Sequence, residues 1–154
     1  MSTVAHARPG VVEQRIRCGE LYVQAEEFYV RQLELRVAGD VEGWTRTFTP
    51  DAVLESAAPG EPARGHAALA ALACGASPRA GADAPAPRYS IGKLEVHPRD
   101  DGALRTWCST IVRLAPAGGG PAGLHVCVVE DVLVRSLAGT WRTGHRRVVR
   151  DVVL

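Results

Sequence analysis

The sequence predicts an α+β fold, because helical patterns come first along the chain and strand patterns follow. Helical spacing of apolar residues dominates up to residue 73, and four long alternating segments joined by short turns fill residues 88–153. This order indicates a strongly curved antiparallel sheet with three helices packed on its concave face, and such a layer pair encloses a pocket. A length of 154 residues is typical of one domain, so we expect a single domain over residues 1–154.

Three helices are predicted, over residues 11–38, 40–48 and 66–73. Apolar side chains recur at helical spacing in the first of them, and Gly39 ends the pattern. Asp40 is a typical N-cap for the second helix. Trp44 and Phe48 lie one turn apart on that helix, so both rings are expected to point inward.

Five strands are predicted, over residues 52–56, 88–97, 103–115, 124–136 and 140–153. Residues 1–12 are expected to form a flexible N-terminus. Residues 75–87 are rich in Gly, Ala and Pro, and this composition predicts a flexible loop.

Charge and hydropathy restrict the classes of partner. Eighteen Lys and Arg residues against 17 Asp and Glu residues give a net charge of +1, and the charges are interspersed along the chain. This pattern argues against a nucleic-acid or membrane-surface partner and favours a small molecule. No segment reaches the roughly 18 apolar residues that span a bilayer, and MSTVAHARPG lacks the apolar core of a signal peptide. We therefore expect a soluble, cytoplasmic protein.

The four cysteines offer no metal site. Cys18, Cys74, Cys108 and Cys127 are far apart in the sequence, with no C-x-x-C pair and no histidine at ligand spacing. We interpret them as buried reduced thiols and expect neither a metal nor a redox dithiol. Cys108 and Cys127 are candidates for neighbours on adjacent strands, which alone does not make a disulfide.

Two adjacent acids stand inside the apolar run VCVVEDVLV, which covers residues 126–134. Side chains alternate between the faces of a strand, so Glu130 and Asp131 point in opposite directions and at least one is buried. Glu130 is flanked by valines, a setting that raises the pKa of a carboxyl and suits a general acid or base. The alternative is an ion pair with an arginine of a neighbouring strand: Arg105, Arg113, Arg142 or Arg150.

Asp131 has the same two interpretations. It is either a salt-bridge partner of Arg146 or Arg147 in the last strand, or the catalytic acid in place of Glu130. His125 lies five or six residues from these acids, about 16 to 20 Å along the strand, so it is expected at the rim rather than beside them. None of the five histidines is predicted to be the catalytic base.

Three stretches resemble a known family. They are FYVRQLELRVAGDVEGWTRTFTPDAVLES, the helix start GHAAL, and the final strand with the pattern W-R-x-x-x-R-R-V-V-R-D. Over about residues 20–152 the chain resembles the SnoaL-like branch of the nuclear transport factor 2-like superfamily. The resemblance implies a cone-shaped sheet that lines a pocket without a metal or organic cofactor. It also implies a homodimer formed through the convex face.

The activities of these relatives frame the functional expectation. They include polyketide cyclases, dehydratases and isomerases, and some relatives have no catalytic activity. The resemblance implies a cofactor-independent cyclase or dehydratase of natural-product biosynthesis, acting by acid–base chemistry on a largely apolar, polyketide-like substrate. The alternative is a non-catalytic domain that binds a ligand or a partner protein.

The remaining candidate site residues are aromatic or polar. Where dehydratase-like and cyclase-like relatives place a histidine, this chain has Tyr89, whose O–H is a candidate to hold a substrate oxygen. Tyr29 is a candidate for the same role from the opposite wall, and either tyrosine is also a plausible core residue. Each remaining candidate also has a purely structural interpretation, as a core residue or as part of an ion pair. These candidate substrate-binding residues are Trp44, Phe48, Trp107, Ser109 and Arg146.

Overall fold

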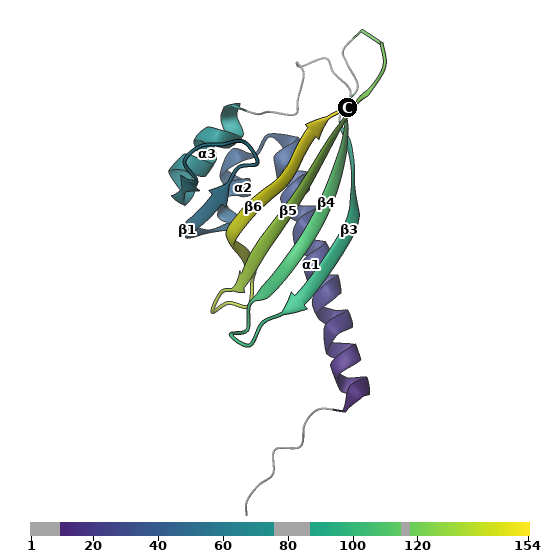
Figure 1. The fold of residues 1–154 in the computed structure, drawn as a ribbon, viewed down its shortest axis with the longest axis vertical. Coiled ribbons are helices and arrows are strands. Elements are labelled where there is room, and N and C mark those ends of the chain that lie inside the picture. Colours follow the sequence, from purple (N-terminus) through teal and green to yellow (C-terminus); the bar gives the residue numbers. More distant parts are fainter. Residues whose placement is uncertain (1–9, 76–86, 115–117) are drawn as a thin grey trace, which may run out of the picture.

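The computed structural model describes residues 10–75, 87–114 and 118–154, and it confirms the α+β class. Figure 1 shows one long helix behind a curved sheet, with two shorter helices beside it. In chain order the elements are α1 (Val11–Ala38), α2 (Val41–Arg46), β1 (Phe48–Glu55), β2 (Ala63–Arg64), α3 (Gly65–Gly75), β3 (Arg88–Pro98), β4 (Leu104–Leu114), β5 (Gly123–Arg135) and β6 (Trp141–Val153).

The strands form one six-stranded sheet in the order β2-β1-β6-β5-β4-β3. The three long hairpins from β3 to β6 are antiparallel, as predicted. β1 instead runs parallel to β6, so the expectation of a purely antiparallel sheet is wrong for this pair. The chain passes through β2 and α3 and then through the long hairpins between β1 and β6, which makes a parallel pairing possible.

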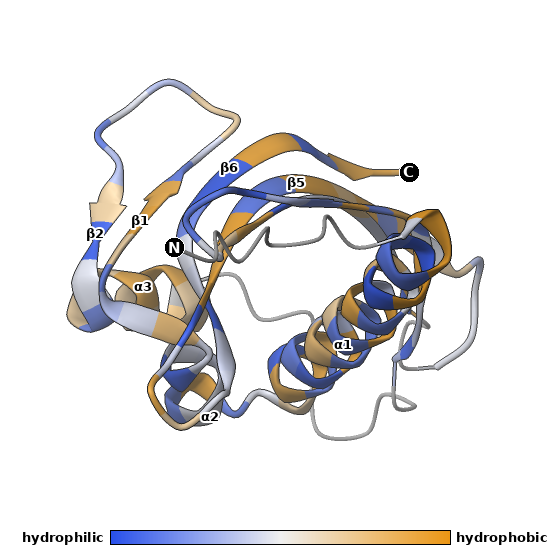
Figure 2. Cartoon of the chain, turned by 90° about the horizontal axis from the view of Figure 1, so that it is seen from below, coloured by the Kyte–Doolittle hydropathy of each residue, from blue (hydrophilic) through white to orange (hydrophobic). Residues whose placement is uncertain are grey.

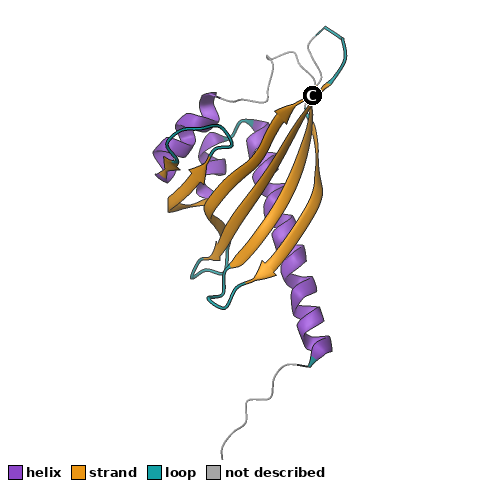
Figure 3. Ribbon diagram, viewed as in Figure 1, coloured by secondary structure: helices purple, strands orange, loops and turns teal. Residues whose placement is uncertain are grey.

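The sheet curves around α1, which lies in its hollow (Figure 2). In β6 the register with β5 shifts twice, leaving Gly144 and Val149 without a partner on β5. Such bulges bend a strand and increase its twist. Figure 3 shows the resulting layers, with the helices on one side of the sheet and the other side free of helices.

The ends of α1 are set by local interactions. At its start, Glu13 Oε2 accepts a hydrogen bond from the backbone N–H of Gly10 at 3.3 Å. At its end, Gly39 adopts φ 75°, a left-handed conformation that favours glycine. Asp40 then caps α2 by accepting a hydrogen bond from the N–H of Gly43 at 2.9 Å. The predicted boundary between the two helices is therefore confirmed.

Two apolar clusters hold the helices against the sheet. The first joins α1 to β3, β4 and β5 through Ala25, Tyr29, Leu94, Leu104, Cys108, Val129 and Leu133. The second joins α2 and α3 to β1 through Trp44, Phe48, Ala52, Leu54, Leu69 and Ala73. The rings of Trp44 and Phe48 are both buried and lie 4.7 Å apart, so the prediction that they point inward is confirmed. Phe48 is the first residue of β1 rather than part of the helix.

The two faces of β5 have different surroundings. Val129, Asp131 and Leu133 are buried on the concave side, where α1 covers them. The face of Cys127, Val129 and Leu133 therefore needs no partner subunit to cover it. The face that no helix covers is the one that bears Glu130.

Other expectations meet the structure only in part. Most of residues 1–12 and 75–87 lie outside the described residues, although Val11 and Val12 belong to α1. All four cysteines are free thiols, as expected, but Cys18 and Cys74 are exposed rather than buried. None of the helices in the described part of the chain combines the length and apolarity needed to cross a bilayer.

Candidate functional site

The centre of the concave face holds a buried ion pair between Asp131 on β5 and Arg146 on β6. Arg146 Nε donates to Asp131 Oδ1 at 2.9 Å, and Arg146 Nη2 donates to Asp131 Oδ2 at 2.7 Å. The two residues are register partners on adjacent antiparallel strands, which aligns the guanidinium with the carboxylate. The Asp131 side chain has 0% exposure. The predicted pairing of Asp131 with Arg146 is thus present.

Five further residues complete what we call the Asp131 network: Tyr29, Gln32, Thr47, Thr106 and Thr143. The hydroxyl of Tyr29 donates to Asp131 Oδ2 at 2.7 Å and lies 2.6 Å from Thr106 Oγ1. Asp131 Oδ2 also accepts a longer hydrogen bond, of 3.5 Å, from the hydroxyl of Thr143. Each buried carboxylate oxygen therefore has at least one donor, as a buried charge requires.

Gln32 extends the network toward α2 and β1. Its Oε1 accepts a hydrogen bond from Arg146 Nη2, and its Nε2 donates to Thr47 Oγ1 at 2.8 Å and to Thr143 Oγ1 at 3.4 Å. Tyr29 and Gln32 are three residues apart on α1, so one face of the helix presents both polar groups to the sheet. Helical spacing alone could not identify this partner of Gln32, because Arg146 lies 114 positions further along the chain.

Burial and charge change the pKa of two members of the network. Burial raises the pKa of Tyr29 well above its usual value, and the nearby negative charge of Asp131 adds to this effect. Burial alone would lower the pKa of Arg146, but the charge of Asp131 and its hydrogen bonds outweigh burial and raise that pKa. Tyr29 is therefore a protonated donor, and Arg146 is a fixed cation.

Arg146 is the charged group of the network that still reaches solvent. Its side chain is 10% exposed. Its Nη1 donates no hydrogen bond to a described residue, and among described residues the only fully buried polar side-chain atom without a partner is Thr49 Oγ1. Nη1 is therefore not completely buried. The guanidinium also lies 5.1 Å from the centre of the Phe48 ring, which brings that predicted residue to the edge of the network.

Glu130 lies on the opposite, convex face and pairs with two arginines. Its side chain is 18% exposed and is hydrogen-bonded by Arg147 of β6 and Arg105 of β4. These hydrogen bonds, from Arg147 first and then from Arg105, lower the pKa of Glu130. The expectation that flanking valines raise this pKa is wrong, because long arginine side chains from both neighbouring strands reach the carboxylate. The alternative of a cross-strand ion pair describes Glu130.

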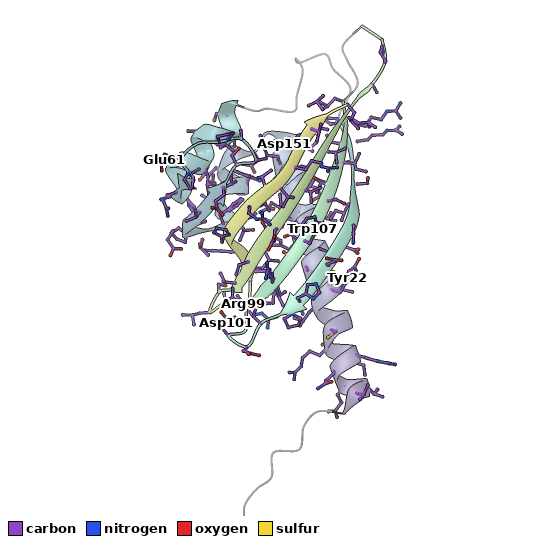
Figure 4. All side chains as sticks on the ribbon, in the orientation of Figure 1. Tyr22, Glu61, Arg99, Asp101, Trp107 and Asp151 are labelled. Carbon is purple, nitrogen blue, oxygen red and sulfur yellow. The ribbon has the colours of Figure 1, made fainter. Side chains whose placement is uncertain are left out.

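Trp107 and Ser109 share this convex face. Trp107 is the register partner of Glu130, and Figure 4 shows it near the middle of β4. Ser109 Oγ accepts a hydrogen bond from the backbone N–H of Lys93 at 2.7 Å. The idea that these two residues join Trp44 and Phe48 around one substrate is therefore wrong, since the sheet separates the two pairs.

Tyr89 faces α1, but far from the Asp131 network. Its hydroxyl donates to Glu34 Oε1 at 3.1 Å. Its register partner on β4 is Val112, whereas Asp131 is opposite Thr106. These two β4 positions are six residues apart, about 20 Å along the strand. Tyr89 and Asp131 therefore do not act on the same bond.

A polar pair that the sequence did not predict lies at the other end of β5 and β6. His125 Nε2 is hydrogen-bonded to Asp151 Oδ1, and both side chains are partly exposed. Figure 4 shows Asp151 toward the C-terminal end of β6. The bulge at Val149 changes which β6 residues face His125, so simple alternation did not reveal the pair. His125 lies at the rim, as expected.

The cysteines and acids do not form a metal site in the described part of the chain. No three His, Cys, Asp or Glu side chains there are placed to hold a metal ion. Burial raises the pKa of Cys108 to about 12 and that of Cys127 to about 11. Both thiols are therefore protonated at neutral pH and are poor nucleophiles.

Comparison with known proteins places this geometry in a family. A family model described as a SnoaL-like domain matches residues 20–147, which include both Asp131 and Arg146. The chain belongs to the SnoaL-like domain family. No curated protein is similar enough to the chain to count as a match.

Solved structures with this SnoaL-like fold come from several bacteria. Aln2 from a Streptomyces species shares 32% identity with a TM-score of 0.73, over 85% of this chain and 91% of that chain. A protein from Catenulispora acidiphila in complex with S-DNPA shares 28% identity with a TM-score of 0.65, over 84% of this chain and 94% of that chain. ActVI-ORFA from Streptomyces coelicolor supports the fold, at 22% identity and a TM-score of 0.74 over 86% of this chain and 97% of that chain.

Proposed function

We propose that this SnoaL-like protein is a cofactor-independent cyclase or dehydratase of natural-product biosynthesis, acting on a largely apolar, polyketide-like ketone. The observation that carries the proposal is the buried pair of Asp131 and Arg146, in which Arg146 Nη1 donates no hydrogen bond to a described residue. Family membership supports the reaction class, since the family includes cyclases and dehydratases.

Arg146 supplies electrophilic stabilisation in this proposal. A substrate carbonyl oxygen accepts a hydrogen bond from Nη1 and gains negative charge as an enolate forms. A preorganised cation in a site with little water stabilises that charge more than water does. Asp131 keeps the guanidinium charged and oriented through its two hydrogen bonds.

Asp131 Oδ1 is the proposed proton acceptor. It accepts one hydrogen bond, from Arg146 Nε, whereas Oδ2 accepts three. For a β-hydroxy ketone, the α-carbon gives its proton to Oδ1 and its electron pair to the carbonyl. When the carbonyl re-forms, the β-hydroxyl leaves with that proton as water. In ring closure the enolate carbon attacks a second carbonyl instead, and that oxygen takes the proton.

The full burial of Asp131 has a mechanistic consequence. Because its side chain has 0% exposure, a substrate reaches Oδ1 only by entering between α1 and the sheet. The same observation favours the second candidate function, a non-catalytic ligand-binding domain in which the network is a structural core. Buried, fully paired polar networks can serve to fix a unique packing.

Turnover of aryl β-hydroxy ketones separates the two functions, since dehydration creates a conjugated enone with a new absorption band. We expect wild-type protein to form the enone and Asp131→Asn to lose about 10² to 10⁴ in rate. Glu130→Gln is the matched control and should keep full activity. Saturable binding of the ketones without turnover would instead support the ligand-binding domain. Turnover that persists in folded Asp131→Asn would remove Asp131 from the mechanism.

The proposal includes no metal, so EDTA should leave the rate unchanged. Loss of activity with a chelator, restored by a divalent ion, would contradict the cofactor-free mechanism.

We also propose a homodimer formed through the convex face. Valines of β5 on that face, beside Trp107 and Ile111 of β4, give it apolar character, and the absence of a covering helix leaves it open (Figure 3). Uncovered apolar side chains on a sheet face favour contact between subunits, and two-fold pairing is the commonest form of such contact. Sedimentation at micromolar concentration should show a dimer, and Val128→Glu should give a folded monomer. A wild-type monomer would contradict the proposal.

A further inference from the structure

A groove lies between α1, α2 and the turn that joins β5 to β6, at the hairpin end of the molecule. Its volume is about 650 Å³, within the range of small-molecule sites. Two aromatic residues, Phe28 and Trp141, line it. Of the Asp131 network, Thr47 alone lines this groove. We call it the Trp141 groove.

One wall of the Trp141 groove carries the guanidinium of Arg135 in a fixed orientation. Gln24 Oε1 accepts hydrogen bonds from Trp141 Nε1 at 2.8 Å and from Arg135 Nη2 at 2.9 Å. The Arg135 guanidinium lies 4.4 Å from the centre of the Trp141 ring. Stacking on an aromatic ring and a shared acceptor restrict the orientation of the guanidinium. Its Nε and Nη1 donate no hydrogen bond to a described residue and remain available to a ligand.

The groove also has an excess of positive charge. Four arginines line it (Arg31, Arg46, Arg135 and Arg142), against two carboxylates, Glu27 and Asp40. Of these arginines, Arg46 is already paired with Glu42. Asp40 Oδ1 already accepts the hydrogen bond that caps α2. Arg31 follows Phe28 by three residues on α1, which places it on the same side of the helix. Within the described residues, Arg31 has no ion pair and no side-chain hydrogen bond.

We propose that the Trp141 groove binds a small aromatic carboxylate. Guanidinium groups bind carboxylates through paired, charge-assisted hydrogen bonds, which fit the free N–H groups of Arg135 and Arg31. The rings of Phe28 and Trp141 offer apolar surface to the flat body of such a ligand. This site goes beyond the proposed reaction, because its anion-binding arginines are not part of the Asp131 network.

The probe is 2-naphthoate, compared with the neutral 2-naphthamide that has the same ring system. Tryptophan indole N–H signals in a ¹⁵N–¹H correlation spectrum report the position of binding, and Trp141→Phe assigns the relevant signal. We expect naphthoate to shift the Trp141 signal saturably. Trp107, on the convex face, is the internal control and should not shift. The amide should bind at least about tenfold more weakly, because it lacks the charge that the arginines recognise.

Arginine variants test the charge directly. Arg31→Gln should weaken naphthoate binding about tenfold, the typical effect of losing a charge-assisted hydrogen bond. Arg150→Gln is the matched control, since Arg150 is opposite Val128 on the convex face and should leave binding unchanged. Arg31 is exposed, so both variants should keep the wild-type thermal midpoint.

Three outcomes would overturn the proposal. They are no saturable shift of Trp141 at millimolar naphthoate, equal affinity for the acid and the amide, and unchanged binding in folded Arg31→Gln. Because the measurement needs no turnover and Arg31 lies outside the Asp131 network, each outcome leaves the proposed reaction untouched.

Discussion

Glu130 and Asp131 are adjacent in the sequence, yet the two faces of the sheet give them opposite environments. Asp131 lies under α1 with a single arginine, a tyrosine and a threonine as donors, and its side chain has no exposure. Glu130 lies between two arginines on the convex face and keeps contact with solvent. The same ionic chemistry is therefore part of a buried core on one face and a surface network on the other. The burial of each acid, rather than its residue type, therefore determines how much it contributes to the free energy of unfolding.

The largest contrast is expected for removal of one charge. Asp131→Asn keeps the shape of the side chain but leaves Arg146 as a buried cation without its anion. Breaking a buried pair in this way typically lowers the free energy of unfolding by about 3 to 5 kcal/mol. Chemical denaturation of the variant and of wild-type protein measures the difference.

A double variant sharpens this test. Removing the cation as well, in Asp131→Asn with Arg146→Met, should recover part of the lost stability, because no unpaired charge remains buried. A double variant less stable than Asp131→Asn alone would show that packing, rather than the unpaired charge, causes the loss.

The contrast between these acids was only partly predictable from the sequence. Alternation along VCVVEDVLV requires Glu130 and Asp131 to face opposite ways, and that is what the structure shows. Alternation does not say which face the helix covers, because both faces of β5 carry valine and leucine. The deciding interaction is the contact of Tyr29 with Asp131, which joins residues 102 positions apart.

The other differences between the predicted and the observed structure have similar causes. The parallel pairing of β1 with β6 and the two bulges in β6 depend on how distant segments meet, and no local pattern encodes them. The valines beside Glu130 are its neighbours in sequence, but the arginines that lower its pKa are its neighbours across strands. The sequence pattern alone shows only the valines. Helix ends, in contrast, follow from local caps such as Gly39 and Asp40, and these were predicted correctly.

A smaller effect is expected from Tyr29→Phe, which removes one donor from the Asp131 network without changing the ring. A lost buried hydrogen bond of this kind costs about 1 to 3 kcal/mol of unfolding free energy. The raised pKa of Tyr29 adds a pH signature. Its contribution is fully present below the unfolded value, near 10, and is lost as the pH rises toward the folded pKa.

Denaturation at pH 8 to 11 measures this signature. Wild-type protein should lose stability above pH 10 more steeply than Tyr29→Phe. Tyr22→Phe is the matched control, since Tyr22 is exposed on α1 and should change the slope little. Equal slopes for wild-type protein and Tyr29→Phe would mean that the Tyr29 hydroxyl is not buried against Asp131 in solution.

The smallest effect is expected from Glu130→Gln on the convex face, measured at a protein concentration low enough to keep the subunits apart. Because Arg147 and Arg105 lower the pKa of Glu130, its stabilising contribution is present above the unfolded value near 4.5 and is lost as the pH falls through the folded pKa. Exposed ion pairs typically contribute about 0 to 1 kcal/mol and are screened by salt. Glu130→Gln should therefore match wild-type stability only once the pH falls below the lowered folded pKa, and the small gap at pH 7 should close in 1 M NaCl. A large, salt-independent loss at pH 7 in the separated subunits would mean that Glu130 is buried within one subunit, and the two faces would then not differ in burial.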